Sequence, residues 1–281
     1  MSTAPAGPEW RDANRANWDE RTPIHVASDF YDVQGFLAGS STLNDFEIEE
    51  IGDVEGASLC HLQCHFGLDT LSWARRGATV VGLDFSKTAI DAACELTRAT
   101  RLPARFVEGD VYDAPSLLGD TFDIVYTGLG ALNWLPDLDA WAGVVAALLK
   151  PGGRLYLVEF HPLLWVLGDD EMAFDARWSY FFDPEGVVID DEVDYADPSI
   201  PLVSTRTHEW AHPLGEVVTA LAHVGLRIEL LSEHQEISYP RFPFLEEVPD
   251  SNRRWRIPPG RAQIPLEYSL RARKGEGASH G

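Results

Sequence analysis

The chain has 281 residues, of which 45% are hydrophobic and 24% charged, so it is neither disordered nor fibrous and can bury a large core. Acidic residues outnumber basic residues 45 to 22, and the formal net charge of −23 repels phosphate backbones and anionic membrane surfaces. We therefore expect no nucleic acid and no membrane as a partner. The three cysteines are too few for a disulfide framework. No apolar run reaches the roughly 18 residues of a membrane span, and no signal peptide is recognisable, so we expect a cytoplasmic protein.

The first two thirds of the chain predict a parallel sheet. Residues 9–21 have a helical pattern that ends at Thr22-Pro23, and we expect this helix to fold over the site as a lid. From residue 57 to 160, short apolar runs alternate with helical patterns, as in βαβ units. The predicted strands are 58–62, 79–83, 104–107, 122–126 and 154–160, and the predicted helices between them are 70–76, 86–101 and 138–149.

The last third predicts an insertion followed by the completion of the sheet. Residues 169–197 are strongly acidic and also carry aromatic and β-branched side chains, so we expect extended, half-buried structure there. A helix over 214–224 and strands over 226–233 and 266–273 follow. We expect one domain over 1–281. Its predicted parts are a lid (1–50), a core (57–160), an inserted roof (161–212) and a C-terminal part (213–274).

Polar or glycine residues follow four successive predicted strands. A loop that ends in Gly67 follows the first strand, and Asp84 ends the second, about 20 residues later, where an acid can accept two ribose hydroxyls. Asp110 and Val111 follow the third strand, and Gly128 follows the fourth. Because the carboxyl ends of parallel strands meet at one edge, we expect the ligand crevice there.

In this order, the segments resemble the motifs of the class I S-adenosylmethionine-dependent methyltransferases. The phrases LQCHFGLDTLSWARRGA, VVGLDFS, FDIVYTGLGALNWLPDL and LKPGGRLYLVEFHP, with the flanks NWDERTPIH and EWAHPLGEVVTALAHVGL, are similar to a bacterial small-molecule subgroup. The resemblance implies an α/β fold, a Rossmann-like three-layer sandwich whose seven-stranded sheet is mostly parallel with an antiparallel last strand. It also implies transfer of a methyl group from S-adenosyl-L-methionine to O, N or C of a small acceptor.

The resemblance further implies a set of cofactor contacts. The backbone from Leu62 to Gly67 would approach the amino-acid part of the cofactor, and Asp84 would bond the ribose. The cofactor-binding residues so predicted are Trp18, Leu62, Gln63, Cys64, Gly67, Asp84, Phe85, Asp110, Val111 and Gly128. The sequence departs from the family at its first motif, where His61, Gln63 and His65 replace an acid and two glycines.

The acceptor side has fewer candidates. His161 follows the fifth strand, and its unperturbed pKa near 6.5 suits a general base. The alternative is a structural histidine before proline. His25, Asn133 and Trp134 are predicted to border the acceptor, although a loop role for His25 and a core role for Trp134 remain open.

The same residues allow two other functions, an NAD-dependent oxidoreductase and a non-catalytic scaffold. Asp84 would bind the ribose of a nicotinamide dinucleotide equally well. The replacement of the glycines of the first motif is also compatible with a fold that has lost catalysis and serves as a binding scaffold. We predict no metal site, because strand alternation sends Cys60 and Cys64 to one face and His61 and His65 to the other. We expect a monomer or homodimer.

Overall fold

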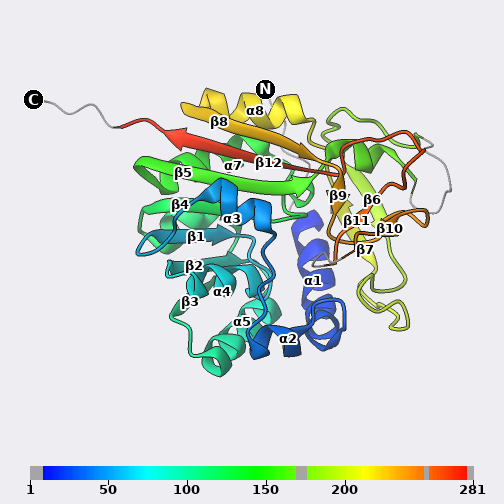
Figure 1. Cartoon of the computed structure of the whole chain (residues 1–281), viewed down its shortest axis with the longest axis horizontal. Helices are drawn as coiled ribbons and strands as arrows, with labels where there is room; N and C mark the ends of the chain where they lie inside the picture. The colour runs from blue at the N-terminus through cyan, green and yellow to red at the C-terminus, as the bar shows by residue number, and fades with distance from the viewer. Residues whose placement is uncertain (1–8, 169–175, 250–252, 277–281) are drawn as a thin grey trace, which may run out of the picture.

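The computed structural model describes residues 9–168, 176–249 and 253–276 (Figure 1). Its main sheet has the strand order β3-β2-β1-β4-β5-β12-β8. The first five strands along the chain pair in parallel, and β12 pairs antiparallel with both β5 and β8. The bounds are β1 (Ser58–Leu62), β2 (Thr79–Asp84), β3 (Ala104–Glu108), β4 (Phe122–Thr127), β5 (Leu149–Phe160), β8 (Leu226–His234) and β12 (Glu267–Lys274). The predicted mostly parallel seven-stranded sheet with an antiparallel last strand is confirmed.

Helices cover both faces of this sheet and make the predicted three layers (Figure 1). On one face, Cys60 and Leu62 of β1 pack in a buried cluster with Trp141 and with apolar residues of the neighbouring helices. On the other face, Leu59 packs with Ile51 and Trp73. The first face carries α6 (Ala114–Leu118), α7 (Leu138–Leu148) and α8 (Leu214–His223), and the second carries α3 (Asp45–Ile51), α4 (Leu68–Arg75) and α5 (Lys87–Thr100). Strand alternation therefore supplies apolar side chains to both faces at once.

The N-terminal helix α1 (Glu9–Ala27) lies across the carboxyl ends of the parallel strands (Figure 1). The predicted end at Thr22-Pro23 is wrong, because the helix continues one turn past the proline. Pro23 removes one backbone N–H, but His25 in the last turn is fully buried, so tertiary contacts hold that turn. The short α2 (Val33–Ala38) follows. The segment predicted as a lid over 1–50 thus has two parts, since α3 packs on a face of the sheet.

The inserted segment forms a roof beside α1. Strands β6 (Val187–Asp190) and β7 (Arg206–Glu209) pair antiparallel, as the prediction of extended structure required, and β7 packs against α1. Part of the predicted insertion, 169–175, lies outside the described residues. The roof also includes a small sheet of β9 (Glu236–Ile237), β10 (Glu246–Glu247) and β11 (Trp255–Arg256). Within the described part of the chain, no helix combines the length and apolar character needed to cross a membrane.

Candidate active site

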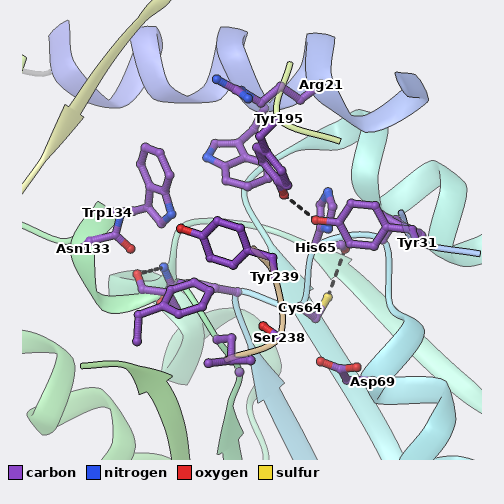
Figure 2. A pocket seen from close by; sticks show the side chains of 18 of the residues that line it. Arg21, Tyr31, Cys64, His65, Asp69, Asn133, Trp134, Tyr195, Ser238 and Tyr239 are labelled. Carbon is purple, nitrogen blue, oxygen red and sulfur yellow. Dashed lines mark hydrogen bonds between the residues drawn. The ribbon is translucent and has the colours of Figure 1, made fainter. Parts of the chain in front are cut away.

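A cavity of about 1100 Å³ lies between the carboxyl ends of the strands, α1 and the roof. Figure 2 shows its interior, with Arg21 on α1, Asn133 and Trp134 after β4, and Ser238 and Tyr239 after β9. Ligand sites in proteins commonly measure ~300 to 1,000 Å³, so this cavity has room for a cofactor and an acceptor together. The predicted residues in its wall are Trp18, Gln63, Cys64, Gly67, Asp84, Phe85, Asp110, Val111, Gly128, Asn133 and Trp134.

Three predicted site residues are not in this wall. The side chain of Leu62 is fully buried in the core cluster between the sheet and α7. His25 is fully buried behind the wall. His161 caps the 3₁₀ turn Pro162–Val166, where its Nδ1 accepts from the Leu163 N–H and its Nε2 lies 3.0 Å from Glu233 Oε1. Because both ring nitrogens of His161 have partners outside the cavity, its position favours the structural alternative over the predicted general base.

The loop after β1 has an unusual backbone. Gln63 and His65 both have positive φ angles, 55° and 51°, at the two positions where the family pattern has glycine. A left-handed conformation costs a residue with a side chain roughly 1 to 2 kcal/mol. The loop is held in place by Asp84, whose Oδ2 accepts a hydrogen bond from the His65 N–H at 2.8 Å.

Asp84 has the surroundings of a ribose-binding acid. It is only 7% exposed but lines the cavity, and its Oδ1 accepts from the Ser86 N–H at 2.9 Å. Burial raises the pKa of this carboxyl to about 6, despite the two backbone donors. Each carboxylate oxygen still has a second acceptor position, so the carboxylate can also take the hydroxyls of a ribose.

Asp110 is tied to the lid helix. Its Oδ2 lies 2.6 Å from Arg11 Nε, and its Oδ1 accepts from the Tyr112 N–H at 2.9 Å. Val111 beside it is 5% exposed and offers an apolar surface to the cavity. An acidic acceptor next to an apolar surface fits an adenine ring, and α1 reaches this end of the cavity through Arg11.

Asp69 gives the cavity a further carboxylate, which the sequence did not point to. A Cβ built on Gly128 would lie 3.5 Å from Asp69 Oδ2 and 3.4 Å from His61 Nε2, so both atoms border the same space. Thr42 donates to Asp69 Oδ1 at 2.5 Å, and burial raises the pKa of Asp69. Burial also lowers the pKa of His61 to about 3, so this ring is neutral. In the sequence, Asp69 is visible only as an acid in the first turn of a helix, and such an acid is common there because it interacts favourably with the helix dipole.

Gly67 lines the cavity, but the structure gives a different reason for its lack of a side chain. A Cβ at this position would lie 2.6 Å from the Phe106 ring and 3.1 Å from Ala93 Cβ, and the φ angle is +85°. Packing against Phe106 and a left-handed backbone therefore already require glycine here.

The loop after β4 presents Asn133 and Trp134 to the cavity. Glu159 of β5 holds the loop, since its two oxygens accept hydrogen bonds from the N–H groups of residues 130, 131 and 132 at 2.6 to 2.9 Å. Asn133 donates through Nδ2 to Glu209 Oε2 at 3.0 Å, and burial raises the pKa of Glu209 to about 7. The Trp134 ring meets the Trp18 ring edge to face, with centroids 5.3 Å apart. Asn133 and Trp134 therefore both line the cavity, on the side that faces the lid helix.

The described residues also bear on the predictions about metals and cofactors. Within 9–168, 176–249 and 253–276, no group of three or more His, Cys, Asp or Glu side chains is arranged to hold a metal ion. The donor set instead suits a nucleoside with a cationic tail: carboxylates at Asp84 and Asp69, an acceptor at Asp110 and apolar surface at Val111 and Phe85. These groups fit S-adenosyl-L-methionine.

Comparison with curated proteins agrees with this assignment. Residues 60–155 match a family model described as a methyltransferase domain. An uncharacterized methyltransferase of Synechocystis is 32% identical over 132 residues, which make up 46% of this chain and 60% of that protein. A ubiquinone biosynthesis O-methyltransferase of Vibrio parahaemolyticus is 27% identical over 135 residues, 47% of this chain and 57% of that protein. The chain therefore spans less than two thirds of the length of these relatives.

Solved structures show the same fold. An S-adenosylmethionine-dependent methyltransferase from Mesorhizobium loti superposes with a TM-score of 0.55 at 18% identity, over 85% of this chain and 100% of that one. Another from Clostridium acetobutylicum gives 0.54 at 16% identity, over 91% and 96% of the two chains. These comparisons give no support to a dinucleotide oxidoreductase or to a scaffold. Residues 60–155 thus match a methyltransferase domain, and the chain has the fold of solved S-adenosylmethionine-dependent methyltransferases, as its motifs predicted.

Proposed function

We propose that this protein transfers the methyl group of S-adenosyl-L-methionine to a hydroxyl of a small aromatic acceptor and releases S-adenosylhomocysteine. The observation that carries the proposal is the division of one cavity into two kinds of wall. The strand-end wall carries Asp69, Asp84 and Asp110, and most of the aromatic rings in the cavity come from the lid and the roof. The aromatic side chains of that second wall are Trp10, Trp18, Phe30, Tyr31, Phe36, Trp165, Trp178, Tyr195, Trp210, Tyr239 and Trp255.

The residues at the strand ends would hold the cofactor. Asp84 would accept the ribose hydroxyls, Asp110 and Val111 would border the adenine, and Asp69 would pair with the ammonium of the amino-acid part. The bound cofactor supplies an activated methyl group on a sulfonium, so the protein has only to align an acceptor and manage one proton.

The charges in the wall argue against an anionic acceptor. The arginines in the described wall are Arg21, Arg241 and Arg253. Arg21 donates to Asp191 and Asp194, and Arg253 donates to the carbonyls of residues 29 and 30. Arg241 donates to the Leu164 carbonyl and lies over the Trp165 ring at 4.8 Å. With these guanidinium groups engaged and many acids in the wall, the cavity disfavours an anionic acceptor.

One observation favours an oxygen nucleophile over nitrogen or carbon. Several curated relatives are named as O-methyltransferases of ubiquinone biosynthesis, and 47% of this chain is similar to them. The acidic chain also supports a small molecule rather than a nucleic acid as acceptor, and we further propose that the protein acts in the cytoplasm as a monomer or homodimer.

The test is methyl transfer from methyl-labelled S-adenosyl-L-methionine to three matched panels: phenols and catechols, arylalkylamines, and aryl carboxylates. We expect label in the phenol panel, and S-adenosylhomocysteine formed in equal amount. Labelling confined to amines would move the reaction to nitrogen, and labelling of carboxylates alone would contradict the proposed acceptor class.

A further inference from the structure

His65 occupies a position at which the family pattern has a glycine, and it adopts the left-handed backbone that a glycine would adopt easily. Strained residues with side chains persist where the surrounding structure over-determines them, and they cluster at functional sites. The structure shows what fixes this one. Its backbone N–H is held by Asp84, and its ring is held from the lid.

The ring of His65 ends a chain of buried hydrogen bonds that crosses from the roof through the lid helix. Asp194 Oδ2 lies 3.0 Å from His25 Nε2, and His25 Nδ1 lies 3.2 Å from His65 Nε2. Asp194 and His25 are both fully buried. His25 is 40 positions from His65 and 169 positions from Asp194 along the chain, so only the fold brings the three residues together.

The charge of Asp194 sets the tautomer of both rings. Burial raises the pKa of Asp194, but the His25 hydrogen bond and the Ala196 N–H outweigh burial and hold it below its ordinary value. Arg21 Nη1 adds a contact at 3.3 Å. An ionised carboxylate only accepts, so His25 donates from Nε2 and keeps a lone pair on Nδ1. His65 then donates from Nε2 to that lone pair, which leaves its own Nδ1 as an acceptor.

That free acceptor belongs to a residue in the cavity wall. His65 lines the cavity and His25 does not, and His65 Nδ1 has no hydrogen-bond partner among the residues that the structure describes. Figure 2 shows His65 beside Tyr31 and below the lid helix that carries Arg21. The rings of Trp18 and Tyr31 lie 5.1 and 5.5 Å from the His65 ring, both edge to face. These rings and the hydrogen bond to His25 hold the imidazole from several sides.

We propose that His65 is the general base of the reaction, taking the proton of the acceptor hydroxyl on Nδ1, with His25 and Asp194 as positioning residues. This inference rests on the proposed function. The acceptor oxygen forms a bond to the methyl carbon, and the bond from that carbon to sulfur breaks with its electron pair kept by sulfur. The hydroxyl proton passes to His65 Nδ1, and His65 Nε2 keeps its own proton toward His25.

The charge balance of this step suits a buried site. A sulfonium charge disappears as an imidazolium charge forms on His65, so the total charge in the cavity does not change. Burial, with His25 and His61 nearby, lowers the pKa of His65 well below its ordinary value, so the ring is neutral before the reaction. The titratable and charged groups around it are Arg21 and His25 on α1, Tyr31, Asp194 and Tyr195 in the lid and roof, and His61, Asp69 and Asp84 at the strand ends.

The first experiment reads the tautomer directly. Long-range ¹H–¹⁵N NMR of the ¹⁵N-histidine-labelled protein with S-adenosylhomocysteine should show His65 protonated on Nε2 and bare on Nδ1. His25→Gln, whose amide oxygen can still accept from His65, should keep that tautomer. His25→Phe should lose it, and His223→Phe, an exposed site on α8, should change nothing. A wild-type His65 bare on Nε2 would overturn the proposal.

The second experiment separates a base from a structural residue. His65→Asn keeps a residue that tolerates the left-handed backbone but removes the base. Its rate with phenol as probe should fall about 10²- to 10⁴-fold. With 4-nitrophenol, which is already ionised at about pH 8 and which this acidic wall should bind weakly, the rate of the variant should fall less than tenfold below the wild-type rate with the same probe. Equal losses with both probes would overturn the proposal, as would a wild-type enzyme that binds S-adenosylhomocysteine but methylates neither phenol. Failure to bind S-adenosylhomocysteine would instead contradict the proposed function.

Discussion

Asp84 Oδ2 accepts a hydrogen bond from the backbone N–H of His65 at 2.8 Å, so the acid that ends β2 also fixes the loop after β1. This single contact joins the predicted ribose site to the strained histidine. Any change to the charge of Asp84 therefore acts on cofactor binding and on the loop together.

Cofactor affinity should fall as the pH falls through 6. The folded protein has the pKa of Asp84 raised to about 6, so the carboxyl of the free protein is protonated below that pH and cannot accept both ribose hydroxyls. We expect the dissociation constant of S-adenosylhomocysteine to rise about tenfold for each pH unit below 6. Calorimetric titrations from pH 5 to 7.5 would measure this. Asp84→Asn should remove the dependence, and an equal slope in that variant would assign it to another group.

Glu159→Gln should destabilise the protein and loosen the loop that carries Asn133. Glu159 accepts from the Gly130 and Phe160 N–H groups on Oε1 and from Ala131 and Leu132 on Oε2. An amide nitrogen in place of one oxygen leaves two N–H donors unpaired, at a cost of about 1 to 3 kcal/mol for each. Urea unfolding measures the loss. Glu95→Gln on the exposed side of α5 is the control, and a Glu159→Gln variant as stable as that control would show that the loop does not depend on these bonds.

The sheet could be predicted because its information is local. Each strand is a short apolar run bounded by turn residues. The residue after each run lies at the carboxyl edge of the sheet, where ligands bind, and this position does not depend on contacts with distant segments. Asp84, Asp110 and Gly128 were found in this way, and all three line the cavity.

The base and its support could not be predicted, because their meaning depends on contacts between distant segments. His65 reads in the sequence as a lost glycine, and His25 as a residue after a helix-ending proline. Only the fold shows that α1 continues past Pro23 and buries His25 between His65 and Asp194. His161 was the opposite case: a plausible position at a strand end, with a side chain that turns away from the cavity.

His161→Ala should leave cofactor affinity and turnover within about twofold of wild type, since its ring caps a 3₁₀ turn outside the cavity. Loss of such a cap costs about 0.5 to 2 kcal/mol of stability. Kinetics below the melting temperature, with a thermal melt of the same sample, separate the two effects. A fall in turnover of a hundredfold or more in a folded variant would return His161 to the catalytic machinery.

Gly67→Ala should destabilise the protein even without ligand, because its Cβ would meet the Phe106 ring and its backbone is left-handed. Left-handed strain alone is worth about 1 to 2 kcal/mol. The matched control is Gly143→Ala in α7, where a Cβ meets nothing within 4 Å. There the substitution should stabilise the helix by roughly 0.5 to 1 kcal/mol. Unfolding free energies that move the same way in both variants would refute this reading of Gly67.

The most direct test of the account is calorimetric titration of the wild-type protein and Asp84→Ala with S-adenosyl-L-methionine, S-adenosylhomocysteine and NAD. We predict one site per chain for the two sulfur nucleosides and no binding of NAD. In Asp84→Ala the binding free energy should weaken by roughly 1.5 to 3 kcal/mol, the range for hydrogen bonds to a charged group. Binding of NAD in preference to S-adenosyl-L-methionine, or sulfur-nucleoside affinity unchanged by loss of Asp84, would contradict it.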